Sequence, residues 1–232
     1  MRAAQRVRLL SVCAVLLLGM SGSAAAQQPQ SQDKPYFAPE LILGVGGSAD
    51  VTPSGAVLNV PVSGDLWSSE PEPTFGFGAK YMHPLHRYFV LGGQLSLQWW
   101  NTQALDDFNQ DRSLLMDLAI VPQGRLPVTD GIELTLGLPV GLSLDFWGGD
   151  GFAFAVGPAA ISADVSTGIG FNLALMFGAR FALSDAIGLI TELGYALHSV
   201  SHSVDVMVLG AAPSGDFDLS LGQPVLQVGV SF

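Results

Sequence analysis

The chain ends on the stretch LSLGQPVLQVGVSF, residues 219–232, and its last side chain is aromatic. On one face of an extended strand the side chains before Phe232 are apolar or small: Val230, Val228, Leu226, Pro224 and Gly222. On the other face they are mostly small or polar: Ser231, Gly229, Gln227, Val225 and Gln223. Successive side chains of a strand point to opposite faces, so this period of two predicts a strand that separates two different media.

Seven earlier segments alternate in the same way, at 36–50, 74–83, 88–101, 112–126, 132–146, 165–183 and 188–203. The fourth is the least regular, because Asp117, Gln123 and Arg125 share a face with apolar residues. The connections between the eight segments alternate between long and short. This pattern predicts an all-β fold, an eight-stranded antiparallel up-and-down transmembrane β-barrel over 36–232 with short periplasmic turns and longer extracellular loops. Residues 57–67 could add a further hairpin to these eight strands.

The composition indicates which face of these strands points outward. Hydrophobic residues make up 49% of the chain and charged residues only 12%, about half the usual charged share of a soluble protein. The apolar faces carry large Leu, Ile and Phe side chains, as at Leu134, Leu136 and Phe171. Such side chains would overfill the interior of an eight-stranded barrel, which only just accommodates side chains. We therefore predict that the apolar faces contact lipid.

Residues 1–26 have the features of a cleaved secretory signal peptide. Arg2, Arg6 and Arg8 precede an apolar run at 9–18, and small residues lead to a cleavage site after Ala26. An uncleaved anchor helix is the alternative, but the apolar run is short for a membrane span. Residues 27–35 then form a flexible lead-in before the barrel, and the predicted location is the bacterial outer membrane.

The cysteine count and the charge exclude several classes of function. Cys13 is the only cysteine and lies in the predicted signal peptide, so we expect no disulfide, no cysteine metal site and no cofactor. Cleavage would remove three of the nine basic residues and no acidic one, which leaves six basic against twenty acidic residues and a net charge of −14. A chain this acidic is not expected to bind nucleic acid.

The signal peptide, the hairpin pattern and the C-terminal Phe232 together resemble the small eight-stranded bacterial outer-membrane β-barrel family, typified by the OmpA transmembrane domain and OmpX. The ending also resembles the C-terminal recognition signal of outer-membrane barrels. The resemblance implies that the barrel-assembly machinery binds the last strand, that lipid and lipopolysaccharide surround the barrel, and that the protein is a monomer.

The charged residues on the polar faces are the candidate functional residues of the lumen: Glu40, Lys80, Asp117, Arg125, Glu133, Asp145, Arg180 and Glu192. All but Asp117 and Asp145 fall near the periplasmic ends of their strands, so we expect them to share one layer and to pair, because an isolated buried charge is costly. The layer is either an ion-pair plug or a purely structural network. A second set is expected at the membrane interfaces: Tyr81, Phe89, Trp99, Phe146, Phe181 and Phe232.

Three functions remain compatible with the sequence. The first is a structural or surface-interaction barrel with an ion-pair-plugged lumen, whose acidic loops either recruit divalent cations that bridge to lipopolysaccharide or only solubilise the surface. The second is a narrow cation-preferring pore for small solutes. The third is a lipid-modifying enzyme using His198 or His202. A neighbouring serine points to the opposite face of the strand from either histidine, so we predict no enzymatic activity.

Overall fold

The computed structural model describes residues 34–54, 56–57, 60–61, 67–101, 112–148, 152–156, 159–208 and 214–232. Its strands are β1 (Tyr36–Gly44), β2 (Ser48–Ser54), β3 (Ala56–Val57), β4 (Val60–Pro61), β5 (Trp67–Ser69), β6 (Thr74–His86), β7 (Phe89–Trp100), β8 (Ser113–Thr129), β9 (Ile132–Gly137), β10 (Val140–Phe146), β11 (Phe152–Val156), β12 (Ala159–Val165), β13 (Gly168–Ala182), β14 (Gly188–Val208) and β15 (Ser214–Ser231). No helix within the described ranges is long and apolar enough to cross a bilayer.

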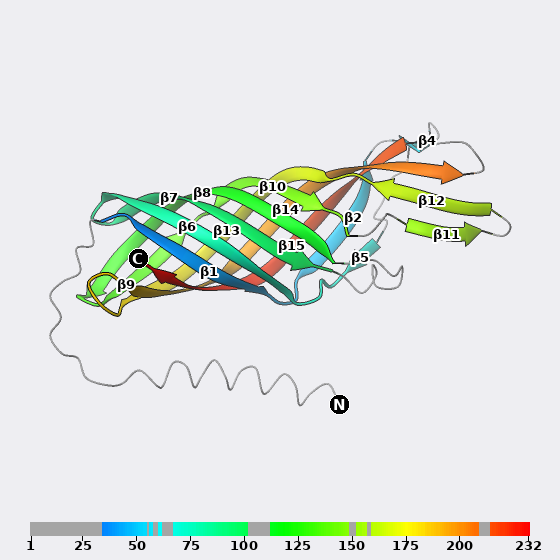
Figure 1. Ribbon diagram of the computed structural model, residues 1–232. Coiled ribbons are helices and arrows are strands. Elements are labelled where there is room, and N and C mark those ends of the chain that lie inside the picture. Colours follow the sequence, from blue (N-terminus) through cyan, green and yellow to red (C-terminus); the bar gives the residue numbers. More distant parts are fainter. Residues whose placement is uncertain are drawn as a thin grey trace, which may run out of the picture.

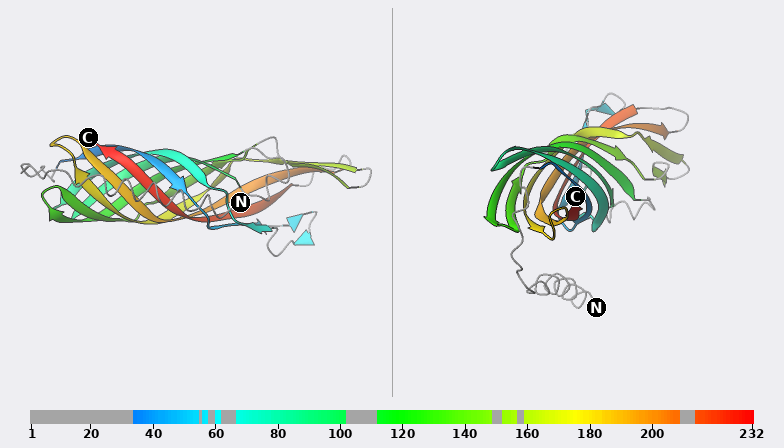
Figure 2. Two further views of the ribbon diagram at one scale, coloured as in Figure 1. Left: turned by 90° about the horizontal axis from the view of Figure 1, so that it is seen from below. Right: turned by 60° about the vertical axis from the view of Figure 1, so that its left-hand side comes forward.

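Eight wall strands form a closed antiparallel ring, which confirms the predicted fold (Figure 1). Three of them are divided into two strands that share at least one neighbour. β1 and β2 both pair with β15, β9 and β10 both pair with β8 and β13, and β12 and β13 both pair with β14. Viewed closer to its axis, the tilted strands curve around into a ring (Figure 2, right).

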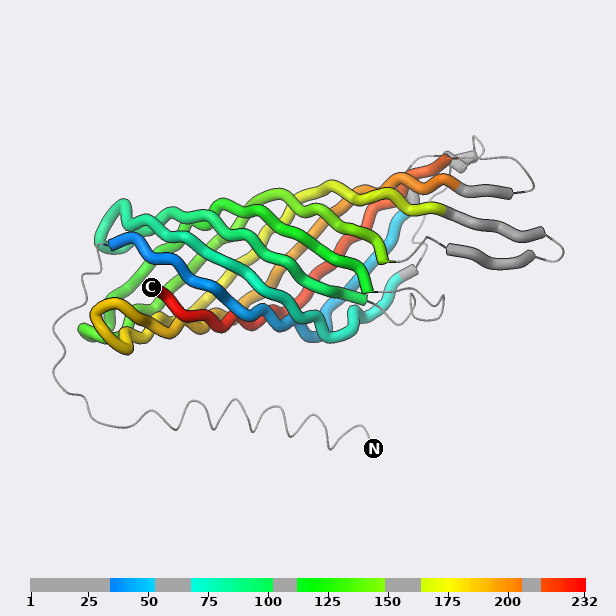
Figure 3. Tube along the Cα trace, viewed as in Figure 1, coloured from blue at the N-terminus to red at the C-terminus, as the bar shows by residue number. Residues whose placement is uncertain are grey.

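The ring closes between the first and the last wall strand, β1 and β15. At this seam Phe37 and Phe232 exchange two backbone hydrogen bonds, of 3.2 and 2.9 Å. The blue and red ends of the tube accordingly lie side by side (Figure 3). We call this end, which also carries the short β6–β7, β8–β9 and β13–β14 turns, the inner end, and the opposite end with the long connections the outer end.

Two of the wall strands are interrupted for chemical reasons. Between β1 and β2, Gly46 and Gly47 have φ values of 64° and 105°, which side chains disfavour. A Cβ at Gly47 would also lie 1.9 Å from the carbonyl oxygen of Gly222. Between β9 and β10, Pro139 accepts a 2.9 Å bond from the Ala174 N–H but has no N–H to return it, while the register with β13 is unbroken on either side.

The large apolar side chains point outward from the wall, as predicted. Leu136 and Phe171 are 55% and 56% exposed, and Ile169 on the same surface is 64% exposed. The polar residues of β8 instead point into the lumen together with Leu115 and Val121, which explains why this strand alternates least clearly in the sequence. The interior is therefore polar at some levels and apolar at others.

The outer connections are more ordered than the sequence predicted. The expected loop at 147–164 contains the β11–β12 hairpin, and β14 and β15 continue to Val208 and from Ser214. These strands project beyond the ring (Figure 1), because β12 extends along β14 as β2 extends along β15. The possible hairpin at 57–67 lies only partly within the described residues, where β3 and β4 pair with each other outside the ring.

Two predicted segments remain: the N-terminal segment, which the structure largely does not describe, and the turn at 127–131. The predicted signal peptide, residues 1–26, and most of the lead-in at 27–35 lie outside the described residues. The turn predicted at 127–131 is shorter than expected, because β8 continues to Thr129 and β9 begins at Ile132.

Candidate functional site

The lumen near the inner end is bridged by one lysine between two glutamates. Lys80 Nζ lies 2.5 Å from Glu192 Oε2 and 3.3 Å from Glu40 Oε1, and all three side chains are almost completely buried. Gln123 donates a 3.4 Å hydrogen bond to the other oxygen of Glu192. Because β6 and β14 are three steps apart around the ring, the Lys80–Glu192 contact crosses the lumen. We call Glu40, Lys80 and Glu192 the inner ion-pair layer.

The two predicted arginines bind different partners. Arg125 donates to the backbone carbonyls of Arg87 and His86 at 2.9 and 3.1 Å, and its Nη1 lies 3.9 Å from Glu133 Oε2. Through these bonds it holds the β6–β7 turn against the barrel wall.

Arg180 lies over the ring of Tyr36, with its Cζ 4.4 Å from the ring centroid. Its Nε donates a 3.1 Å hydrogen bond to Ser231 Oγ. The six charges expected in one layer are therefore near one another but divided among three groups of contacts.

Asp117 is the centre of a polar cluster farther along the lumen. It accepts hydrogen bonds from Ser143 Oγ at 2.6 Å, Ser96 Oγ at 3.0 Å and Gln98 Nε2 at 3.4 Å. His198 Nδ1 lies 3.3 Å from the same carboxylate and 3.3 Å from Ser143 Oγ. Asp117 is thus surrounded by neutral donors and one histidine.

Asp145 is held by an aromatic cluster toward the outer end. Trp100 Nε1 donates to Asp145 Oδ1 at 3.0 Å, and His202 Nε2 lies 3.2 Å from Oδ2. The His202 ring stacks on Phe217, with centroids 4.9 Å apart, and meets Trp147 edge to face at 5.4 Å. We call Trp100, Trp147, His202 and Phe217 the outer aromatic layer.

His202 Nδ1 also lies 2.9 Å from the carbonyl oxygen of Ser166. A carbonyl can only accept a hydrogen bond, so Nδ1 carries a proton. Apolar side chains surround the layer and fill this part of the lumen: Ala49, Val51, Leu115, Val200, Leu219 and Leu221.

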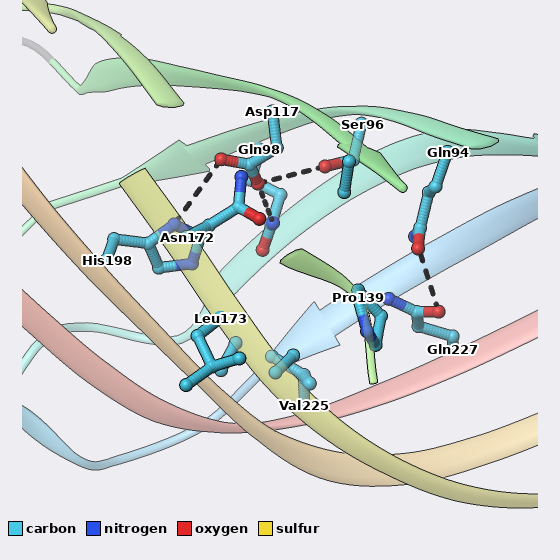
Figure 4. Close-up of a pocket in the computed structure, with 13 residues that line it drawn as sticks. Gln94, Ser96, Gln98, Asp117, Pro139, Asn172, Leu173, His198, Val225 and Gln227 are labelled. Carbon is cyan, nitrogen blue, oxygen red and sulfur yellow. Dashed lines mark hydrogen bonds and ion pairs between the residues drawn. The ribbon is translucent and has the colours of Figure 1, made fainter. Parts of the chain in front are cut away.

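A cavity of about 30 Å³ lies between the two layers. Gln94, Ser96, Gln98, Asp117, Asn172, His198 and Gln227 contribute polar side chains to its lining, with Pro139, Leu173 and Val225 among the apolar ones (Figure 4). Its position follows from β14, along which Glu192 of the inner ion-pair layer, His198 at the cavity and His202 of the outer aromatic layer follow one another. The lumen is therefore divided into an ion-paired, a polar and an aromatic level.

Comparison of the sequence with known proteins finds no match for this chain, whereas comparison of the structure finds similar folds. No protein-family model matches it, and no curated protein matches its sequence. Among solved structures, the outer membrane protein OprG from Pseudomonas aeruginosa superposes with a TM-score of 0.58 over 85% of this chain and 94% of its own, at 11% identity. The chain has the fold of the small eight-stranded outer-membrane β-barrels.

Two further outer-membrane barrels match with lower scores. AlkL, solved in lipid bilayers, has 16% identity, a TM-score of 0.46 and coverage of 91% of this chain and 93% of its own. Neisserial surface protein A has 11% identity, a TM-score of 0.40 and coverage of 84% and 98%. Neither of these two likenesses assigns an activity to this chain.

The predicted interface aromatics of this outer-membrane barrel are all on the outside of the wall. Tyr81, Phe89, Phe146 and Phe232 are exposed, and Trp99 and Phe181 are partly exposed. Trp99 stacks on Phe75 with ring centroids 5.4 Å apart. Trp100, the next residue on β7, is completely buried inside the barrel.

The two histidines are the residues whose role the sequence did not reveal. The sequence marks them only as catalytic candidates, whereas the structure pairs His198 with Asp117 and His202 with Asp145. The sequence could have placed them in the lumen, because both lie an even number of residues from the luminal Glu192 on β14 and therefore share its face. This spacing predicts the face of the strand on which a side chain lies, but not which residue it meets across the lumen.

The polar cluster at Asp117 does not have the geometry of a hydrolase triad. In a triad the histidine binds the acid through one ring nitrogen and the serine through the other. Here Asp117 Oδ1 and Ser143 Oγ both lie 3.3 Å from Nδ1 of His198. Within the described residues there is also no group of three His, Cys, Asp or Glu side chains placed to hold a metal ion.

We predict that Lys80→Met strongly destabilises the barrel. It leaves two buried carboxylates without their cation, which should cost about 3–5 kcal/mol of unfolding free energy. Equilibrium unfolding in urea after reconstitution into bilayers measures this loss. The triple variant Lys80→Met, Glu40→Gln, Glu192→Gln removes all three charges and should recover most of it.

The matched control for this prediction is Arg112→Met. Arg112 pairs with Glu72 at 3.3 Å, but the two side chains are 41% and 29% exposed, so less than about 1 kcal/mol should be lost. Equal losses for Lys80→Met and Arg112→Met would contradict a buried, paired inner ion-pair layer.

Proposed function

We propose that this protein is an outer-membrane β-barrel whose lumen is closed, and that it serves a structural or surface-interaction role. The observation that carries the proposal is the pair of barriers across the lumen. At the inner ion-pair layer Lys80 joins β1, β6 and β14. At the outer aromatic layer side chains from β7, β14 and β15 meet with Trp147. A continuous water column would have to displace both.

The surface-interaction role is supported by an acidic face beyond the ring. Asp164 and Asp205 are direct cross-strand partners on β12 and β14. The pairing registers place three further aspartates on the same face of the projecting strands: Asp50, Asp216 and Asp218. Like charges directly opposite each other are destabilising, and divalent cations relieve such repulsion. Bridging through these cations to lipopolysaccharide phosphates is the interaction this surface suits.

The last strand is the proposed contact with the barrel-assembly machinery. Phe232 is 60% exposed at the seam between the first and last strands. An exposed terminal aromatic at the point where the ring closes is accessible before closure, which supports recognition of this strand during insertion. The lipid-facing surface is expected to keep the protein monomeric.

A narrow cation-preferring pore is the second candidate function. The polar cavity around Asp117 favours it, because a carboxylate and amide oxygens line the middle of the lumen. The pore requires that both barriers open at equilibrium.

Single-channel recording in planar bilayers distinguishes the two functions. We predict that the wild-type protein gives no steady conductance. A variant that combines Glu40→Ala, Lys80→Ala and Glu192→Ala with Trp100→Ala lacks side chains at both barriers and should conduct. The control is Trp100→Ala alone, which keeps the inner ion-pair layer and should remain silent. Steady cation-selective current steps in the wild type would contradict the closed barrel and support the cation-preferring pore.

We also predict that Asp164→Asn with Asp205→Asn weakens Mg²⁺-dependent binding of the barrel to lipopolysaccharide micelles. Loss of one bridging cation should lower the apparent affinity by about five- to tenfold, equivalent to roughly 1 kcal/mol. The matched control is Asp130→Asn with Asp185→Asn, which removes two exposed carboxylates from the inner turns. Equal binding by both double variants would rule out the acidic face as the contact.

A further inference from the structure

We propose that the cavity between the two layers is a binding site for a small monovalent cation accompanied by water. The volume of about 30 Å³ fits about two water-sized occupants, since one needs roughly 10–15 Å³. The proposal concerns an ion held inside the barrel and does not depend on whether the lumen is closed or conducts.

The lining presents hydrogen-bond acceptors that have no partner. They are Gln94 Oε1, Gln98 Oε1 and His198 Nε2, on side chains that belong to residues 6%, 4% and 5% exposed. Buried polar atoms are normally paired, and leaving one unpaired costs about 1–3 kcal/mol. Three such atoms around one cavity indicate an occupant that supplies donors or positive charge.

One donor of each of these side chains is already used. The amide nitrogen of Gln98 points to Asp117 Oδ2 at 3.4 Å, and that of Gln94 to Gln227 Oε1 at 3.5 Å. His198 directs Nδ1 toward Asp117 and Ser143. With its proton on Nδ1, the ring offers a lone pair at Nε2. The unpartnered polar atoms of this lining are therefore acceptors, which a cation or a water donor can pair.

The charge of Asp117 points to a cation rather than to water alone. Its hydrogen-bond donors Ser96, Ser143 and Gln98 are neutral, and among the described residues His198 is its single ionisable ion-pair partner. Lys80 and Arg125 instead contact Glu40, Glu192 and Glu133. A buried carboxylate without a cation is costly, and a bound cation would compensate its charge.

The lining holds a single carboxylate, Asp117, whose one negative charge is balanced by a monovalent cation. One carboxylate and two amide oxygens are hard ligands, which suit alkali-metal ions and the N–H donors of ammonium. Transition metals and zinc are bound by sets of histidine, cysteine and carboxylate ligands, and this cavity offers only His198 and Asp117 of those types. Sodium, potassium and ammonium are thus the candidate occupants, and a protonated His198 with water alone is the alternative.

Thermal unfolding of the refolded protein tests the proposal. The chain is refolded into detergent micelles in sodium, potassium, ammonium or N-methylglucamine chloride at one ionic strength, so that the occupant enters during folding. N-methylglucamine is too large for the cavity. We expect the unfolding midpoint to rise saturably with at least one of the three small cations, relative to N-methylglucamine.

Two variants and one control locate the effect. Asp117→Asn should abolish the dependence on the small cation. Gln98→Met keeps the carboxylate, removes one unpartnered oxygen and should raise the half-saturating concentration by about tenfold; it decides the question if Asp117→Asn does not fold. Asp145→Asn removes the other aspartate that is paired with a histidine, outside the cavity, and should leave the dependence intact.

Two outcomes would overturn the proposal. A wild-type midpoint that is the same in all four salts means that the cavity holds water only. A saturable rise that persists unchanged in Gln98→Met, and in Asp117→Asn where it folds, means that the cation binds elsewhere.

Discussion

The structure depends on one constraint: in hydrocarbon every backbone N–H and C=O must find its partner within the protein. A sheet satisfies this only when it has no free edge at membrane depth, and here the edge is removed by pairing β1 with β15. The paired backbone bonds of Phe37 and Phe232 complete that seam. The outward Leu, Ile and Phe side chains follow from it, because a closed ring of eight strands leaves room inside only for small, polar or tightly paired groups.

The interior shows two physical solutions to the problem of filling a narrow lumen. Near the inner end charges balance one another: the three cations Lys80, Arg125 and Arg180 lie among the carboxylates of Glu40, Glu133 and Glu192. Toward the outer end apolar packing dominates, and the one carboxylate there is held by Trp100 and His202. In the polar cavity between them, neither ion pairing nor apolar packing fills the lumen completely. The hydrogen-bond donors to the carboxylate there are neutral, and some acceptors in the lining have no partner.

The sequence predicts what depends on local periodicity. A period of two determines which residues face the lumen, so the barrel, the outward direction of Leu136 and Phe171, and the inward position of the eight charged residues all follow from it. It does not determine which side chains meet across the ring, because that depends on strand tilt and register. The pairs Asp117–His198 and Asp145–His202 were missed for this reason. The β11–β12 hairpin was missed because its Gly- and Ala-rich sequence is also typical of a loop.

Adjacent residues on β7 allow a direct test of whether hydrocarbon contacts the outward face of the wall. Trp99 lies on the outside and Trp100 is completely buried in the lumen. Two variants that each keep only one of these tryptophans, with the others replaced by phenylalanine, are reconstituted into bilayers whose acyl chains carry bromine. If lipid contacts the outer wall, Trp99 fluorescence is strongly quenched and Trp100 fluorescence is quenched little. Equal quenching of both, or quenching of Trp100 alone, would contradict this contact.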